Sequence, residues 1–146
     1  MSELRTIIHR DLEWDAGHRV FNHESKCNHL HGHRYKARIF VTAAKLDDLD
    51  RVIDFGVVKG LLLPWINKNW DHATILNSED PLVPLLQGAG QNINIIEGEN
   101  PTAEVMARVL FQYAEMLLPE TIDVVGVRLW ETPNCAAYYG EAPCPG

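Results

Sequence analysis

Apolar and polar residues alternate along three stretches of the chain, and this period of two predicts β-strands. The stretches cover approximately residues 6–18, 31–43 and 122–132. In the first, Leu12, Trp14 and Ala16 lie on one side and acidic residues lie on the other. Because the first two stretches follow each other closely, we expect them to pair in one sheet with their apolar faces on the same side.

Two amphipathic helices are predicted by apolar residues that recur with a period near 3.6. Asp54 is expected to cap the first helix, and Pro64 to kink or end it. Asn100 is expected to cap the second helix, with Pro101 at its first position and Pro119 beyond its end. The expected buried stripes are Phe55, Val58, Leu61, Leu62 and Ile66 in the first helix, and Met106, Val109, Leu110, Tyr113 and Leu117 in the second.

The order of these elements predicts an α+β fold in which helices cover one face of an antiparallel sheet. Residues 78–98 are the least patterned part, with one or two helical turns near 82–86 and a short strand at 93–96. Cys135, Tyr138 and Tyr139 are interpreted as structural, and the segment after Gly140 as loosely ordered.

Composition narrows the class of protein. The chain has 146 residues, 46% of them hydrophobic, so we expect residues 1–146 to form one globular domain. A net charge of −7 excludes a broad basic surface, so no nucleic-acid partner is expected. No apolar run reaches membrane-spanning length and the N-terminus does not resemble a signal peptide, which favours a cytoplasmic protein. The 3 cysteines are then free thiols or metal ligands.

Three histidines are predicted to converge at one end of the apolar sheet face. His31 and His33 are separated by one residue, so their side chains point the same way in a strand, and His18 continues the apolar stripe of the first strand. Three buried imidazoles are costly as packing but suit a zinc site with an open fourth position. His29 would lie about 13 Å from His33 in an extended chain, too far to bind the same ion.

Further groups are candidates for acid–base chemistry beside this site. Cys27 is either a fourth, structural ligand or a reactive thiol, and a single cysteine among histidines favours the reactive role. Asp71 and His72 are adjacent, as a proton relay requires. Glu131 ends the apolar face of the last strand, where it is either exposed at the sheet end or lines a pocket.

Positively charged residues crowd around the histidines in the sequence: Arg19, Lys26, Arg34, Lys36 and Arg38. Such a cluster could bind an anionic substrate. The alternative is that the three residues on the second strand form an ordinary solvated strand face.

Taken together and in order, these motifs resemble those of the 6-pyruvoyl-tetrahydropterin synthase family. The resemblance covers about residues 10–139. The motifs are Ala16-Gly17-His18, Cys27-x3-His31-Gly32-His33, Val52-Ile53-Asp54-Phe55, Asp71-His72, Asn100-Pro101-Thr102-Ala103-Glu104 and Trp130-Glu131-Thr132. A cysteine at this distance before His-Gly-His is most similar to the bacterial branch, which makes 6-carboxy-5,6,7,8-tetrahydropterin in queuosine biosynthesis.

The resemblance implies a tunnelling fold, with a four-stranded antiparallel sheet and two helices on one face. Such chains assemble into trimers whose sheets form a barrel, and the trimers often pair into hexamers. The pterin site then lies at a subunit interface. The implied reaction converts 7,8-dihydroneopterin triphosphate into 6-carboxytetrahydropterin, acetaldehyde and triphosphate.

The resemblance also implies a role for each motif. The zinc ligands would be His18, His31 and His33. Cys27 would accept a proton, with Asp71 and His72 as its relay, and Glu131 would anchor the pterin ring and join that relay. Residues near the substrate would be Thr102 and Thr132, and we hypothesise that Lys26 meets the triphosphate.

Three alternative functions stay open from the sequence. The cysteine disfavours the folate-precursor branch of the family but leaves a 6-pyruvoyl-tetrahydropterin product possible. A non-catalytic module that binds zinc and a pterin would keep the histidines and Glu131 but would not need Cys27. A zinc hydrolase that uses metal-bound water would not need this thiol either.

Overall fold

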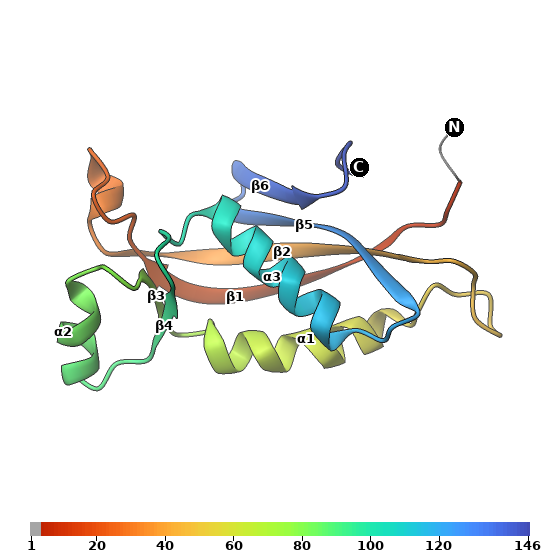
Figure 1. Ribbon diagram of the computed structural model, residues 1–146, viewed down its shortest axis with the longest axis horizontal. Coiled ribbons are helices and arrows are strands. Elements are labelled where there is room, and N and C mark those ends of the chain that lie inside the picture. The colour runs from red at the N-terminus through yellow and green to blue at the C-terminus, as the bar shows by residue number, and fades with distance from the viewer. Residues whose placement is uncertain (1–3) are drawn as a thin grey trace.

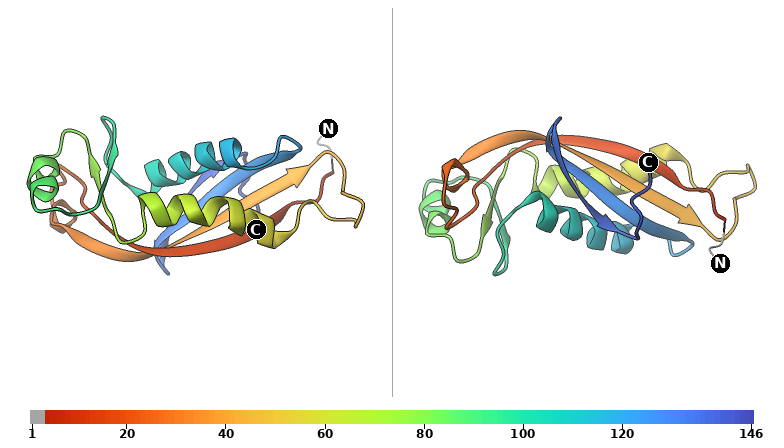
Figure 2. Two further views of the ribbon diagram at one scale, coloured as in Figure 1. Left: turned by 90° about the horizontal axis from the view of Figure 1, so that it is seen from below. Right: turned by 90° about the horizontal axis from the view of Figure 1, so that it is seen from above.

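A computed structural model describes residues 4–146, and its main feature is a six-stranded sheet with two long helices on one face (Figure 1). In sheet order the strands are β4 (Ile93–Ile96), β3 (Thr74–Asn77), β1 (Ile8–His18), β2 (His31–Ala43), β5 (Ile122–Thr132) and β6 (Cys135–Gly140). The helices are α1 (Phe55–Asn69), α2 (Leu82–Gly88) and α3 (Ala103–Leu117). Views from above and below place α1 and α3 on the same side of the twisted sheet (Figure 2).

The long strands β1, β2 and β5 form the antiparallel centre of the sheet, as their alternation predicted. The implied sheet of four antiparallel strands is wrong, because β3 runs parallel to β1 and β4 runs parallel to β3. The alternation of apolar and polar residues missed β3, because this strand is four residues long and nearly all buried. It also missed β6, an edge strand of small and aromatic residues that pairs with β5.

Helix α1 begins as predicted, because the Asp54 carboxylate accepts a hydrogen bond from the Gly56 N–H at 2.7 Å. Pro64 does not end the helix, which continues to Asn69. Pro64 is exposed, so water can satisfy the carbonyl that its missing N–H leaves free. Phe55 and Leu61, predicted as buried, are 51% and 37% exposed, because α1 meets the sheet along a narrower stripe.

Helix α3 begins two residues later than predicted. Its cap is Thr102, whose hydroxyl accepts a hydrogen bond from the Val105 N–H at 3.2 Å. Asn100 does not cap the helix, because its side chain binds a different segment of the chain. The helix ends before Pro119, as expected. No helix among residues 4–146 is long and apolar enough to cross a membrane.

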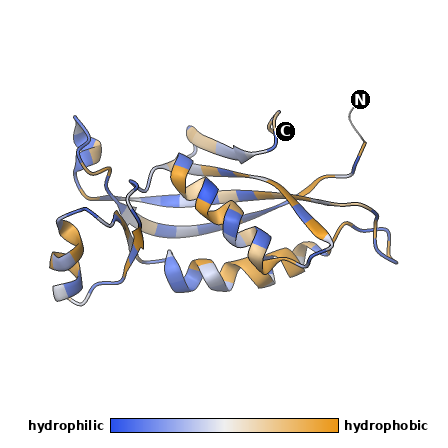
Figure 3. Ribbon diagram, in the orientation of Figure 1, coloured by the Kyte–Doolittle hydropathy of each residue, from blue (hydrophilic) through white to orange (hydrophobic). Residues whose placement is uncertain are grey.

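The core lies between the sheet and the two long helices. Trp14 and Tyr35 stack on neighbouring strands with ring centroids 5.6 Å apart. The ring centroids of Trp65 in α1 and Tyr113 in α3 lie 4.3 Å apart, so these two side chains pack the helices against each other. Hydrophilic and hydrophobic residues both occur along α3 (Figure 3). Predicted stripe residues that are fully or almost fully buried are Val58, Leu62, Ile66, Met106 and Leu110.

The other face of the sheet carries ion pairs between β1 and β2. Arg38 binds both carboxylate oxygens of Asp11, at 2.7 and 2.9 Å, and Lys36 lies 3.9 Å from the same carboxylate. Arg34 lies 3.2 Å from Asp15. These cations therefore have acidic partners on their own face, which supports the interpretation of a solvated strand face.

Asp11 gives the fold a testable dependence on pH. Its hydrogen bonds from Arg38 hold the pKa of the carboxyl below its usual 3.8. A lowered folded-state pKa means that the pair stabilises the protein above about pH 4 and loses this contribution as the pH falls through the folded pKa. We expect Asp11→Asn to cost about 0.2–1 kcal/mol of unfolding free energy at about pH 6 and much less at about pH 3. Urea unfolding at both pH values measures this, and an equal cost at both would contradict it.

Candidate active site

Strand pairing brings the three histidines together at the end of the apolar sheet face. His18 is the last residue of β1 and lies directly opposite His31, the first residue of β2. His33 lies opposite Ala16, one step further along the same face. One ligand atom from each of the three histidines lies within 4.8 Å of the others. The register that the alternation predicted is therefore what assembles this cluster.

Backbone carbonyls orient two of these rings. His18 donates from Nδ1 to the Pro101 carbonyl at 2.7 Å, and His31 donates from Nδ1 to the His29 carbonyl, also at 2.7 Å. The Nε2 atoms of both rings then carry lone pairs, yet they lie only 3.2 Å apart. Two nitrogens bound to one tetrahedral zinc ion at about 2.0–2.1 Å would be about 3.3 Å apart. The donor set therefore fits a divalent metal ion.

The third ring supports the same interpretation. The Nε2 atom of His33 is buried and has no hydrogen-bond partner among the described residues. Burial lowers the pKa of His18 to about 4, and burial also lowers the pKa of His33. Both rings are thus neutral near pH 7, which is the form that binds metals.

A cavity of about 580 Å³ opens beside the histidines. Glu131, from the end of β5, enters it with carboxylate oxygens 4.0 Å from His18 Nε2 and 3.9 Å from His33 Nε2. Burial raises the pKa of Glu131, as does the nearby Glu104, while the backbone N–H of Ala103 favours the ionised form. The sequence left Glu131 either exposed at the sheet end or lining a pocket, and in the structure it lines a pocket.

Four residues with a polar or reactive side chain also line this cavity. Lys26 and Cys27 come from a short 3₁₀ turn, Lys26–Asn28, between β1 and β2. Thr132 also lines the cavity, and its hydroxyl accepts a hydrogen bond from the Asn134 N–H at 3.2 Å. Cys135, which the sequence interpretation left as structural, lines it as well. The signal available for Cys135 was its place in the sequence, four residues after Glu131 and directly after the turn at residues 133–134.

Comparison with known proteins gives the family. The model of the 6-pyruvoyl tetrahydropterin synthase family matches residues 7–142. The chain belongs to this family. Among its relatives are 6-carboxy-5,6,7,8-tetrahydropterin synthase from Rickettsia conorii, 41% identical over 86% of this chain and 94% of the relative, and a probable enzyme of the same name from Halobacterium salinarum, 37% identical over 88% and 82%.

Solved structures support the fold of this family member. An uncharacterized protein from Wolinella succinogenes superposes with a TM-score of 0.80 over 94% of this chain and 99% of that one, at 21% identity. The 6-pyruvoyl tetrahydropterin synthase of Plasmodium falciparum gives a TM-score of 0.73 over 94% and 98%, at 15% identity. These likenesses establish a tunnelling-type α+β fold.

Asp71 and His72, the residues predicted to act as a relay, contact each other but do not line the histidine cavity of the same chain. His72 Nδ1 lies 3.0 Å from Asp71 Oδ2, and this hydrogen bond lowers the pKa of Asp71. Asp15 holds the pair: its N–H donates to Asp71 at 3.1 Å, and its carbonyl accepts from the His72 N–H at 2.7 Å. The His72 side chain is 75% exposed and lines a separate hollow with Arg34.

Two further predicted residues have their polar groups already engaged. The Thr102 hydroxyl caps α3, so it places the helix start beside Glu131. Arg19, from the predicted cationic cluster, binds Asp80 with two nitrogens and does not line the histidine cavity. Of the five clustered cations, Lys26 is the one that lines it.

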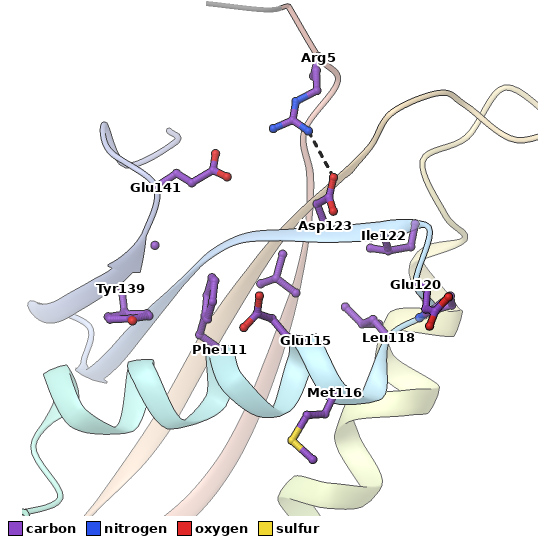
Figure 4. Close-up of a pocket in the computed structure, with 13 residues that line it drawn as sticks. Arg5, Phe111, Glu115, Met116, Leu118, Glu120, Ile122, Asp123, Tyr139 and Glu141 are labelled. Atoms are coloured by element: carbon purple, nitrogen blue, oxygen red, sulfur yellow. Dashed lines mark hydrogen bonds and ion pairs between the residues drawn. The ribbon is translucent and has the colours of Figure 1, made fainter.

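A hollow larger than the histidine cavity lies elsewhere in this family member, between α3, β5 and the end of β6 (Figure 4). It measures about 790 Å³ and contains the Arg5–Asp123 ion pair, at 3.4 Å. Most of its other charged groups are acidic, Glu115, Glu120 and Glu141 among them. It offers neither a histidine nor a cysteine, so size alone is a poor guide to the chemistry of this fold.

Proposed function

We propose that the protein is a zinc-dependent 6-carboxy-5,6,7,8-tetrahydropterin synthase. It converts 7,8-dihydroneopterin triphosphate into 6-carboxytetrahydropterin, acetaldehyde and triphosphate, as a cytoplasmic single-domain enzyme of queuosine biosynthesis. The observation that carries this proposal is one cavity in which three converging imidazoles, a half-buried carboxylate and a thiol meet. Relatives of that name, up to 41% identical, support the choice of reaction.

In this proposal His18, His31 and His33 hold the zinc ion. When bound, zinc acts as a Lewis acid that makes carbon-bound protons beside coordinated hydroxyls more acidic. The two carbonyls that fix the ring tautomers direct both Nε2 lone pairs to one point. The chain therefore prepares the donor set before any ion binds.

Glu131 anchors the pterin ring. A carboxylate accepts two hydrogen bonds, which matches the donor edge of a pterin. The N-terminus of α3 lies next to it and favours its ionised form despite burial. Thr102, at the cap of that helix, and Thr132, beside Glu131 in the cavity wall, approach the same ring.

We expect Glu131→Gln to raise the KM for the pterin substrate by about 10- to 100-fold, because a hydrogen bond to a charged group contributes about 1.5–3 kcal/mol. Zinc content should stay at the wild-type level, since the three imidazoles remain. Steady-state kinetics with metal analysis measures both values. Glu104→Gln is the matched control, because Glu104 is an exposed neighbouring carboxylate, and its KM should change little. An unchanged KM in Glu131→Gln would remove the anchor role.

Cys27 accepts the substrate proton, and Asp71 with His72 completes the relay from a second copy of the chain. Within one chain the relay lies outside the cavity that Cys27 lines. Its exposed imidazole and firm backbone anchoring suit a group that enters a neighbouring site. We therefore propose a trimer, or a dimer of trimers, with the active site at the subunit interface. Lys26 meets the triphosphate as the cation in the cavity wall.

A second candidate is 6-pyruvoyl-tetrahydropterin synthesis, which is favoured by the name of the matching family model. Mass analysis of the products from dihydroneopterin triphosphate and zinc-loaded protein distinguishes the two. Carboxytetrahydropterin with equimolar acetaldehyde is the expected result. Pyruvoyl-tetrahydropterin without acetaldehyde would support the second candidate, and unreacted substrate with zinc bound would favour a binding module.

A further inference from the structure

Residues 19–30, here called the thiol loop, carry Lys26 and Cys27 into the histidine cavity. Apart from one 3₁₀ turn the loop has no regular structure. Its internal hydrogen bonds close the loop on itself, such as the bond from the Val20 N–H to the Cys27 carbonyl at 2.9 Å. These bonds fix the shape of the loop but not its place over the histidines.

A buried ion pair connects the thiol loop to the rest of the fold. Arg19 donates from Nε to Asp80 Oδ2 at 2.7 Å and from Nη2 to Asp80 Oδ1. Its third nitrogen, Nη1, lies 3.5 Å from the carbonyl of Asn28, the residue after Cys27. The Asp80 side chain is fully buried. The guanidinium thus contacts both Asp80 and the turn that carries Cys27.

Asp80 is itself held rigidly. Its Oδ1 accepts a hydrogen bond from the Leu82 N–H at 2.8 Å, and its own N–H donates to the Asn77 carbonyl at 3.0 Å. It therefore joins the end of β3 to the start of α2. The thiol loop and α2 lie at the same end of the molecule (Figure 1). Residues 78–98, which had no role in the sequence interpretation, supply the support for this loop.

A second contact acts on the same loop from the segment that precedes α3. The Asn100 side chain donates to the Phe21 carbonyl at 3.0 Å and accepts from the Phe21 N–H at 3.1 Å. The two supports approach from different elements, so the loop is fixed at both Arg19 and Phe21. A flexible loop would not need two such specific contacts merely to cover a surface.

We propose that Asp80 is a positioning residue that, through Arg19, sets the place of Cys27 over the metal site. The assignment of Cys27 as the reacting thiol rests on the proposed function. A buried ion pair contributes little net stability, because desolvation offsets the attraction, whereas its two parallel hydrogen bonds fix direction and distance. Loss of the Asp80 charge leaves the Arg19 guanidinium without its partner, which weakens the fold as well as moving the thiol, so the test measures the thiol itself.

The test compares Asp80→Asn with Asp11→Asn in the full-length, zinc-loaded protein. Asp11 makes the same two-bond pair, with Arg38, on the other sheet face and does not line the histidine cavity. The first readout is the rate of Cys27 alkylation by iodoacetamide, followed by mass spectrometry, with Cys144, which does not line the histidine cavity, as the internal reference. For Asp80→Asn we expect a Cys27 rate at least about five times that of wild type, with an unchanged reference rate, and no such change for Asp11→Asn.

The second readout is turnover at constant zinc content. Misplacement of a reacting group by about 1 Å can cost about 100-fold, so we expect kcat of Asp80→Asn to fall by about 10- to 100-fold, and by more than KM rises. Arg19→Gln is the second variant, because it removes the contact to Asn28 while Asp80 still binds the start of α2. It should reproduce both effects even if Asp80→Asn does not fold.

Three results would overturn the proposal. They are an unchanged Cys27 rate in both variants, an equal rise at Cys27 and Cys144, and the same effect in Asp11→Asn. A wild-type protein that does not turn over the pterin would instead count against the proposed function. The alkylation comparison would still decide whether Asp80 positions the thiol.

Discussion

Replacing His31 with alanine is expected to remove zinc and turnover together. His31 supplies one of three converging nitrogens, and its Nε2 lies 3.2 Å from that of His18. Structural zinc sites with four ligands bind with about 10–16 kcal/mol, or roughly 3 kcal/mol for each ligand. Loss of one ligand should therefore weaken zinc binding by about 100-fold or more. Competition with a chromophoric chelator measures the affinity, and product formation measures turnover.

The matched control for this prediction is His29→Ala. His29 is exposed, is not part of the three-residue cluster, and contacts His31 through its backbone carbonyl, which alanine retains. This variant should keep both zinc and activity. Full zinc affinity in His31→Ala would contradict the ligand assignment. Equal loss in both variants would point to a general disturbance of this strand end instead.

Replacing Cys27 with alanine is expected to lower kcat by about 100- to 10,000-fold, the usual contribution of a positioned general base. Zinc should stay bound, because the imidazoles are untouched and the thiol is not part of the three-histidine cluster. Binding of the pterin should change little, since Glu131 and the cavity wall remain. Single-turnover kinetics, zinc analysis and substrate titration on the same preparation separate these three quantities.

Cys144→Ala provides the control for the thiol. Cys144 lies near the C-terminus, where Arg128 donates to its sulfur, and it does not line the histidine cavity. Its replacement should leave kcat unchanged. Retained activity in Cys27→Ala would instead favour hydrolysis by metal-bound water, in which the thiol has no part. If the wild-type protein also fails to turn over the substrate, the result would favour a non-catalytic module that binds zinc and a pterin.

The sequence predicted the central strands and the histidine cluster for one physical reason. A period of two fixes which face each residue occupies, and a buried face fixes the register, so His18 had to meet His31. The resemblance to the family placed Cys27 and Glu131 near the same point, and both line the cavity. The prediction that Asp54 caps the first helix, made from its residue type and its position before the apolar stripe, is also confirmed.

The remaining features depend on contacts between distant segments. Nothing near Arg19 in the sequence indicates that its partner is Asp80, sixty-one residues away, so it was grouped with the free cations. Asn100 has the composition of a helix cap, but Phe21 offers its side chain two hydrogen bonds at once. The relay residues Asp71 and His72 formed as a pair, yet their distance from the cavity follows from the course of the chain after α1, which no local pattern encodes.

Four consecutive residues, from Asn100 to Ala103, each support a different part of the site. Asn100 and Thr102 do so with their side chains, whereas Pro101 holds His18 through its carbonyl and Ala103 favours ionised Glu131 through its N–H. Alanine scanning would therefore detect only half of this segment. The other half acts through peptide groups, so ester replacement of single amide bonds, rather than mutation, is the way to reveal it.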